Sequence, residues 1–164
     1  MAVDPRIDPI SVERVKLLHP YIRLEVMDGL SLCINSNVPI RVVQGFRTIE
    51  EQDKLYAQGR TAAGPVVTMV KGGSSWHNFA VAFDFCLLRG GKSISWNRDE
   101  NLDGDRVKDW TEVVDIFMKR GFEWGGNWQF KDYPHFQKTF GLTIFKAKEL
   151  LSLKKVDKNG YIRI

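Results

Sequence analysis

Residues 75–84 are Ser-Trp-His-Asn-Phe-Ala-Val-Ala-Phe-Asp, and this stretch decides how the middle of the chain folds. From Ala80 to Leu88 the residues are apolar almost without interruption, which predicts a buried β-strand. Neighbouring side chains on a strand point to opposite faces. Phe83 and Phe85 therefore share a face of large residues, and Asp84 lies on the opposite face among small ones.

The carboxylate of Asp84 needs a positive partner, because burying an unpaired charge is costly. A bound cation would provide one, and so would the guanidinium of Arg47. His77 lies just before the predicted strand, and His135 can supply a third ligand. Two histidines and one carboxylate suit a catalytic zinc site, which keeps a fourth position for water. The spacing alone leaves both interpretations open, since a lone histidine is more often a surface or core residue.

A second candidate segment, residues 132–136, is Asp-Tyr-Pro-His-Phe. The bend at its proline can turn Asp132 and His135 toward one point. A carboxylate beside a metal-bound water is the general base that hydrolysis requires. The alternative is that Asp132 only caps a turn, which is a common role for aspartate.

The remaining sequence predicts an α+β fold with a small, mainly antiparallel sheet flanked by helices, because helices and strands do not alternate strictly. Ser11 is the expected N-cap of the first helix, and Thr48 with Glu51 matches a capping box. The glycine-rich residues 59–75 form a long connection of the kind that is often functional. We expect helices over 11–35 (with a new start at Pro20), 48–58, 107–120 and 142–153, and strands over 39–45, 80–88 and on both sides of 125–127.

The composition of the chain limits the classes of protein to which it can belong. The chain has 164 residues, 43% of them hydrophobic, which is enough for one folded domain and excludes a wholly disordered chain. We expect a single domain over residues 1–153 and a solvated, basic tail over 154–164. Cys33 and Cys86 do not form a disulfide framework, which is typical of a reducing compartment. No apolar run approaches the ~20 residues of a membrane span, and residues 1–6 lack the pattern of a secretory signal.

Together these motifs resemble a known family. Residues 75–84 resemble the S-x-H-x-x-G-x-A-x-D signature of the zinc D-Ala-D-Ala carboxypeptidase and L-Ala-D-Glu endopeptidase family, peptidoglycan peptidases with the fold of the Hedgehog signalling domain. Residues 132–136 are most similar to the L-Ala-D-Glu branch of bacterial wall enzymes and phage endolysins. Residues 44–56 are similar to the family's upstream arginine motif. The match covers roughly residues 39–140 in the right order.

The resemblance implies roles for individual residues. It implies that His77, Asp84 and His135 bind Zn²⁺, and that Asp132 is the catalytic base. It implies that Arg47 steadies the scissile carbonyl oxygen as negative charge develops there.

The resemblance is less specific about the substrate. It implies that Ser75 and Gln52 contact the substrate or support groups that do, and Trp128 is a further candidate for the substrate cleft. Ala80 departs from the family pattern, which has glycine there. If the position requires a positive φ, alanine costs about 1 kcal/mol or more, and if it requires only a small side chain, alanine is harmless.

The implied substrate is the peptidoglycan stem peptide, cut at the L-Ala-D-Glu bond, with D-Ala-D-Ala as the second candidate bond. A non-catalytic wall-binding module on the same fold is the alternative from another class. A nucleic-acid binder would rest only on the net charge of +4. We expect a monomer that reaches the wall without a visible signal, by phage lysis or a nonstandard export route.

One further motif resembles a calcium loop. Within Asp99–Asp109, the order of Asp99, Asn101, Asp103 and Gly104 matches the first half of an EF-hand loop. Position 12 of that frame should be glutamate and is Trp110. A polar turn before the next helix is therefore the favoured interpretation.

Overall fold

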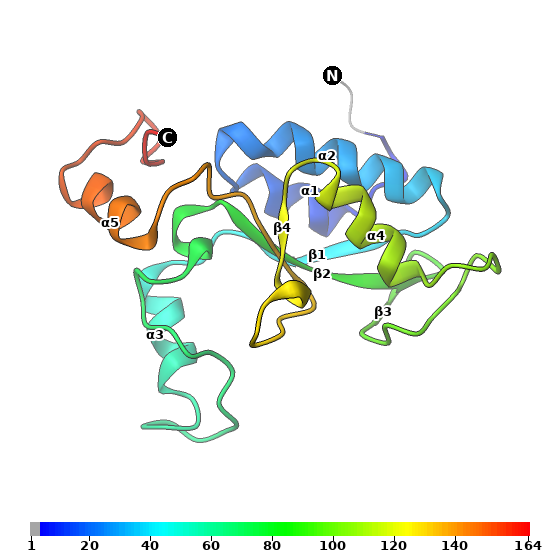
Figure 1. Cartoon of the computed structure of the whole chain (residues 1–164), viewed down its shortest axis with the longest axis horizontal. Coiled ribbons are helices and arrows are strands. Elements are labelled where there is room, and N and C mark those ends of the chain that lie inside the picture. Colours follow the sequence, from blue (N-terminus) through cyan, green and yellow to red (C-terminus); the bar gives the residue numbers. More distant parts are fainter. Residues whose placement is uncertain (1–3) are drawn as a thin grey trace.

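A computed structural model describes residues 4–164, and residues 1–3, which belong to the stretch assessed for a signal, lie outside it. None of the helices within the described range is both long and apolar enough to cross a membrane. The expected α+β class is confirmed (Figure 1). The elements are α1 (Pro9–Lys16), α2 (Pro20–Asn35), β1 (Ile40–Gln44), α3 (Ile49–Ala57), η1 (Trp76–Phe79), β2 (Ala82–Arg89), β3 (Ser93–Ser95), α4 (Asp109–Met118), β4 (Glu123–Trp124), η2 (Gly125–Asn127), β5 (His135–Gln137) and α5 (Ile144–Ser152).

The sheet is antiparallel and is organised around β2. Across residues 4–164 the strand order is β1-β2-β5-β4, and β3 pairs with the far end of β2. Asp84 lies opposite His135 on β5, and Gln44 on β1 faces the same aspartate across an irregular register. Two segments that are 51 residues apart in the sequence are thereby brought together at the centre of the sheet.

The alternation predicted for the central strand is present. Phe83 and Phe85 are fully buried in the main core, where both contact Phe136 on the neighbouring strand. Helices α2 and α4 pack against each other over this face, and Phe83 also contacts Phe117 of α4 (Figure 1). Each buried phenylalanine contributes about 1.5–3 kcal/mol. The core therefore fixes β2 from one side and presents Asp84 on the other.

The start of α3 agrees with the sequence-based prediction, and the start of α1 differs from it. Thr48 and Glu51 form the expected capping box at the start of α3. The prediction that Ser11 caps the first helix is wrong, because the N-cap is Asp8, whose carboxylate accepts a hydrogen bond from the Ser11 N–H. Pro9 then occupies the first helical position, where its missing N–H costs nothing.

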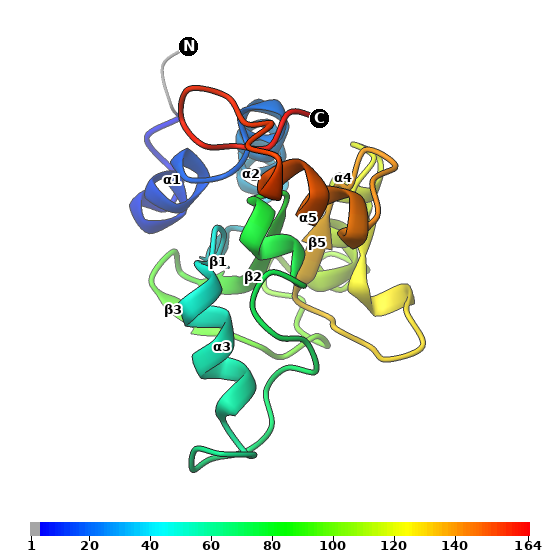
Figure 2. The ribbon, with the colours of Figure 1, turned by 90° about the vertical axis from the view of Figure 1, so that its left-hand side faces the viewer.

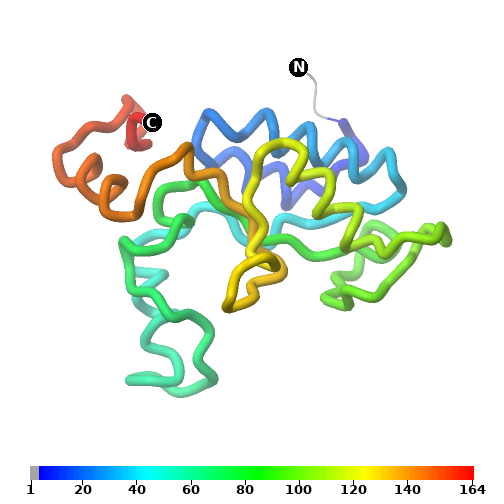
Figure 3. Tube along the Cα trace, viewed as in Figure 1, coloured from blue at the N-terminus to red at the C-terminus, as the bar shows by residue number. Residues whose placement is uncertain are grey.

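Most of the C-terminal residues 154–164 are exposed, as expected of a basic tail, but the segment also carries a buried apolar side chain. Ile162 is 3% exposed, and the segment folds back through a bridge between Val156 and Ile162. The His19 Nε2–H donates to the Ile162 carbonyl at 2.9 Å. This places the end of the chain beside the start of α2 (Figures 2 and 3).

The backbone at Ala80 decides between the two alternatives, because the position has a positive φ. Ala80 ends η1 with φ 60° and ψ 23°, in the left-handed region. Only glycine adopts this region without a steric penalty of about 1–2 kcal/mol. The side chain is nevertheless buried at 1% exposure, which shows that the surroundings hold the strained residue in place.

We expect Ala80→Gly to raise the free energy of unfolding by about 0.5–1 kcal/mol, because relief of strain exceeds the entropic cost of glycine. Urea denaturation of the whole chain measures the change. Ala82→Gly is the matched control, because Ala82 lies in regular strand and its replacement should destabilise the protein. A loss of stability in Ala80→Gly would mean that packing of the Ala80 methyl group outweighs its backbone strain.

Candidate metal centre

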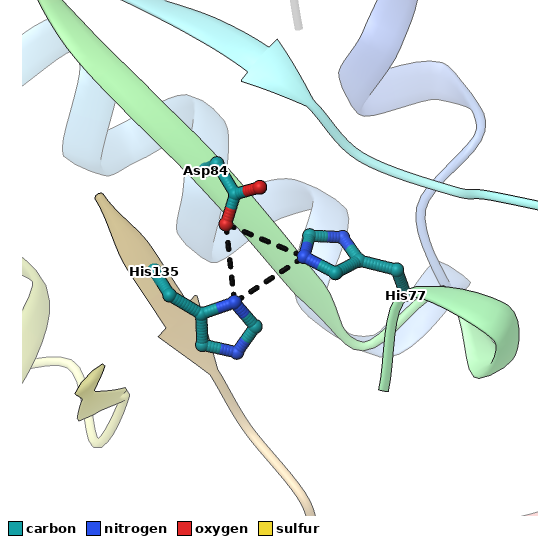
Figure 4. Close-up of side chains that lie close together, drawn as sticks. All are labelled: His77, Asp84 and His135. Carbon is teal, nitrogen blue, oxygen red and sulfur yellow. Dashed lines mark hydrogen bonds and ion pairs between the residues drawn. The ribbon is translucent and has the colours of Figure 1, made fainter. Parts of the chain in front are cut away.

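Three predicted ligands meet at one point. His77 comes from η1, Asp84 from β2 and His135 from β5, and their side chains point toward one another (Figure 4). His77 Nε2 lies 3.2 Å from His135 Nδ1 and 3.3 Å from Asp84 Oδ1. His135 Nδ1 lies 3.1 Å from the same carboxylate oxygen. These atoms form a nearly equilateral triangle of potential ligands.

Local sequence explains how His77 reaches this triangle. Ser75 and Asn78 form a capping box that starts η1 immediately before the histidine. The left-handed residue Ala80 then ends the turn, so that the chain enters β2 two residues later. His77 is therefore held in the turn, and Asp84 near the start of the strand that follows it.

In both histidines, the ring nitrogen that lies outside the triangle already has a hydrogen-bond partner. His77 Nδ1 lies 2.8 Å from the Gly45 carbonyl oxygen, and His135 Nε2 lies 3.1 Å from Gln137 Oε1. The Gln137 amide is oriented by its own donation to Glu123 at 2.9 Å. When each histidine is neutral and donates outward, the inner nitrogens carry lone pairs. Two lone pairs and a carboxylate oxygen then face one point, which attracts a cation.

The electrostatics of the triangle also favour positive charge. Burial alone would raise the pKa of Asp84, but the neighbouring His77 and His135 lower it. Burial alone would lower the pKa of His135, but its contacts with Asp84 raise it. A proton and a metal ion therefore compete for the same place.

The donor set fits zinc. Imidazole nitrogen and carboxylate oxygen are zinc ligands at about 2.0–2.1 Å, and tetrahedral ligands at that range lie about 3.3 Å apart. The three observed separations of 3.1–3.3 Å are close to this value.

Arg47 lies beside the triangle and is held from several sides. Its N–H donates to the His77 carbonyl, and its own carbonyl accepts from the Asn78 amide. Its Nη1 donates to Gln52 at 2.8 Å, while Nη2 is 3.9 Å from Asp84 Oδ2. Burial lowers the pKa of the guanidinium, and its buried Nε has no hydrogen-bond partner among residues 4–164. Arg47 is thus only a distant partner of Asp84 and keeps donors for another group.

Asp132 lies at the rim of the same site. Its N–H donates to the Gly125 carbonyl at 3.0 Å, and its carbonyl accepts from the His135 N–H at 3.2 Å. A Cβ at Gly125 would lie 2.4 Å from the Asp132 carbonyl oxygen, so this close approach requires glycine. Burial of the carboxyl group and then the charge of Asp84 raise the pKa of Asp132. A raised pKa suits a base that works near neutral pH.

A pocket of about 450 Å³ opens over these residues. The predicted substrate-facing residues Ser75 and Trp128 line it, and the Trp128 ring lies 5.1 Å from that of His135. Gln52 does not line it and is fully buried. The lining residues are Arg47, Leu55, Val67, Thr68, Val70, Ser74, Ser75, Trp76, His77, Asp84, Trp128, Asp132, His135, Gln137 and Ile144.

One wall of the pocket is formed by residues 59–75, here called the strap. Gln52 donates to Thr68 Oγ1 and to the Val70 carbonyl, and Asp53 accepts from the Gly72 N–H. Gln52 therefore joins the strap to Arg47 from behind the pocket wall.

Sequence reasoning missed three residues that support this site. Gln137 and Glu123 orient His135, and Asn78 joins the Arg47 backbone to η1. Gln137 follows His135 by two positions on a strand, so the alternation of side chains could have identified it. Glu123 had no such signal, because its place depends on the pairing of β4 with β5.

Comparisons with known proteins identify a family and two similar proteins. The sequence profile of a family described as D-alanyl-D-alanine carboxypeptidase matches residues 69–138. The peptidoglycan L-alanyl-D-glutamate endopeptidase CwlK of Bacillus subtilis (strain 168) is 41% identical over 121 residues, which cover 73% of this chain and 72% of CwlK. The crystal structure of the Serratia marcescens L-Ala D-Glu endopeptidase ChiX has a similar fold. Its TM-score is 0.58 at 24% identity, over 82% of this chain and 90% of that chain.

Proposed function

The chain belongs to the family of peptidoglycan peptidases that includes D-alanyl-D-alanine carboxypeptidases and L-alanyl-D-glutamate endopeptidases, and we propose that it is a zinc-dependent endopeptidase that cuts the L-Ala-D-Glu bond of the stem peptide. The observation that carries the proposal is the triangle of His77, Asp84 and His135, with sides of 3.1–3.3 Å, in a pocket that also contains Asp132 and Arg47. The 41% identity to CwlK supports the choice of bond.

The residues divide the work of hydrolysis. His77, Asp84 and His135 would hold the zinc ion through their three converging atoms. When bound, zinc acts as a Lewis acid and lowers the pKa of a coordinated water to about 7. Asp132 accepts the proton of the attacking water and returns it to the leaving amine. Arg47 donates hydrogen bonds to the carbonyl oxygen as negative charge develops there.

The bond can be identified by mass spectrometry of muropeptides after digestion of purified sacculi. Cleavage at L-Ala-D-Glu leaves L-Ala on the glycan strand and releases a peptide that begins with D-Glu. Cleavage at D-Ala-D-Ala instead shortens stem peptides by one terminal D-Ala and would contradict the proposed bond. If no new amino groups appear, the chain is not the hydrolase proposed here.

Removing the metal should abolish hydrolysis reversibly, because the three ligands would lose the ion they are placed to hold. A chelator with nitrogen donors, used with calcium in excess, removes zinc without removing ions that prefer oxygen ligands. Adding zinc should restore the rate, and the melting temperature should fall and recover in parallel, because the ligands meet only in the folded chain. Full activity in metal-free protein would overturn the zinc assignment.

A further inference from the structure

The mouth of the pocket carries a positive charge that the proposed mechanism does not use. Lys148 is exposed and lies on α5, one turn after Ile144, which lines the pocket. Residues four apart on a helix share a face, and a helical side chain tilts back over the preceding turn. Helix α5 lies beside the end of the strap (Figure 2), where Lys148 Nζ donates to the lining residue Ser74, at 3.2 Å from its Oγ. The helix position and the hydrogen bond both place this ammonium group at the pocket mouth.

The charge of Lys148 has no partner of opposite sign in the part of the chain that the structure describes. None of the ion pairs there includes it. The adjacent Glu149 pairs with Lys146 instead, at 2.7 Å. An ammonium group has three donors, and Ser74 Oγ accepts one of them. The other donors are therefore available to a group that enters the pocket.

Other cations near the pocket are placed differently. The guanidinium of Arg60 lies 4.0 Å from the ring centroid of Tyr56, and Lys71 Nζ lies 5.5 Å from the same centroid. Tyr56 belongs to α3 and does not line the pocket. Arg47 lies inside the pocket, beside the metal triangle, where we assign it to the scissile carbonyl oxygen. Among these four cations, Lys148 is the one placed for a more distant part of the substrate.

The proposed substrate carries negative charge beyond the scissile bond. D-Glu of the stem peptide is linked through its γ-carboxyl group, so its α-carboxyl group stays free next to the scissile nitrogen. The third stem residue adds a free carboxyl group when it is meso-diaminopimelate, and a side-chain ammonium group when it is L-Lys. In an extended stem, the carboxyl group of the third residue can lie about 10–14 Å from the scissile nitrogen. The D-Glu carboxylate therefore stays beside the reacting atoms, whereas that of the third residue can reach the pocket mouth.

We propose that Lys148 is a specificity-determining residue that binds the side-chain carboxylate of the third stem residue, so that stems with meso-diaminopimelate are cut in preference to stems with L-Lys. This inference rests on the proposed cleavage at L-Ala-D-Glu. Attraction to one side chain and repulsion from the other both contribute to the preference. An ion pair at an exposed site is weak, so we expect a preference of about 3–10-fold.

The test compares two substrates of the zinc-loaded full chain. Both are muramoyl peptides of sequence L-Ala-γ-D-Glu-X-D-Ala, in which X is meso-diaminopimelate or L-Lys. The α-carboxyl group of X lies in a peptide bond in both, so the substrates differ only in the side chain of X. The KM should be lower for the meso-diaminopimelate peptide, and the preference should shrink as ionic strength rises.

The outcomes of this comparison separate the present inference from the proposed function. Equal KM values for the two peptides would contradict the role of Lys148 and leave the proposed hydrolysis intact. If neither peptide is cut, the proposed function fails, and the inference that rests on it fails with it.

Charge variants identify the residue responsible. Lys148→Gln should raise the KM for the meso-diaminopimelate peptide by about 2–5-fold and bring the two KM values close together. Lys148→Glu should reverse the preference, because its carboxylate attracts the ammonium group of L-Lys. Lys148→Arg keeps the charge and should keep the preference. A preference unchanged in both Lys148→Gln and Lys148→Glu would overturn the proposal.

Lys146→Gln is the matched control. Lys146 is also exposed on α5, but it follows Ile144 by two residues, lies on a different face of the helix and pairs with Glu149. Its replacement should leave the preference between the two peptides unchanged. An equal loss of preference in Lys146→Gln and Lys148→Gln would mean that the net charge of α5, and not a contact of Lys148, selects the substrate.

A third peptide distinguishes the two carboxylates of the stem. It keeps meso-diaminopimelate but has D-isoglutamine in place of D-Glu, so the α-carboxyl group next to the scissile nitrogen is an amide. Lys148→Gln should raise the KM for this peptide by the same factor as for the parent peptide, because the carboxylate of the third residue is intact. If the effect of Lys148→Gln disappears, the ammonium group binds D-Glu and the assignment to the third residue is wrong.

Discussion

Replacing Asp132 by alanine is expected to lower the rate of peptidoglycan hydrolysis by about 10²–10⁴-fold while the protein keeps its zinc and its fold. The proposal gives Asp132 only the proton of the attacking water, and the carboxylate lies outside the triangle formed by His77, Asp84 and His135. Asp132→Asn should behave in the same way, because the amide preserves the shape but is not a base. The measurements are zinc per chain by elemental analysis and the rate on purified sacculi.

Asp84→Ala provides the contrast for this experiment. Asp84 contributes an oxygen to the triangle, so its removal should lose zinc and activity together. If Asp132→Ala empties the site of zinc, Asp132 is a ligand and its assignment as base is wrong. If Asp132→Ala retains both zinc and full activity, the base lies elsewhere and the proposed mechanism fails.

Arg47→Lys is expected to reduce kcat by about 10²–10³-fold with little change in zinc content. The Arg47 side chain donates a hydrogen bond to Gln52 at 2.8 Å, and within the described part of the chain its buried Nε has no partner. Lysine keeps the charge but lacks the planar fork that can bind Gln52 and the substrate oxygen at the same time.

Arg60→Lys is the matched control for Arg47→Lys, because Arg60 belongs to the strap and does not line the pocket. It should retain near-normal kcat. Normal turnover in Arg47→Lys, combined with weaker zinc binding, would make Arg47 a structural partner of Asp84 and remove its catalytic role.

The central strand could be predicted from the sequence because its periodicity is local. Alternation of Phe83, Asp84 and Phe85 requires only that the segment be extended, and the core of large residues confirms it. The C-terminal segment could not be predicted in the same way. Its many lysines favoured the prediction of a solvated tail. Val156 and Ile162 nevertheless pair across a turn and pack on a second small core.

The same difference between local sequence signals and tertiary contacts applies to the candidate site. His77 and Asp84 could be chosen as candidate ligands because η1 and β2 adjoin in the sequence, and His135 could be chosen from the separate motif at residues 132–136. The left-handed backbone of Ala80 and the support that Glu123 gives to Gln137 depend on tertiary contacts.

The attachment of the strap has a consequence for how this enzyme can diversify. Gln52 and Asp53 hold the strap largely through its main chain, at the Val70 carbonyl and the Gly72 N–H. Main-chain atoms are the same for every residue type, so the side chains at 67 and 70 can be exchanged while the path of the strap is retained. The proposed ligands lie on the sheet and its adjoining turn, apart from these positions. Substrate preference can thus drift among descendants of this chain without any change in the chemistry it performs.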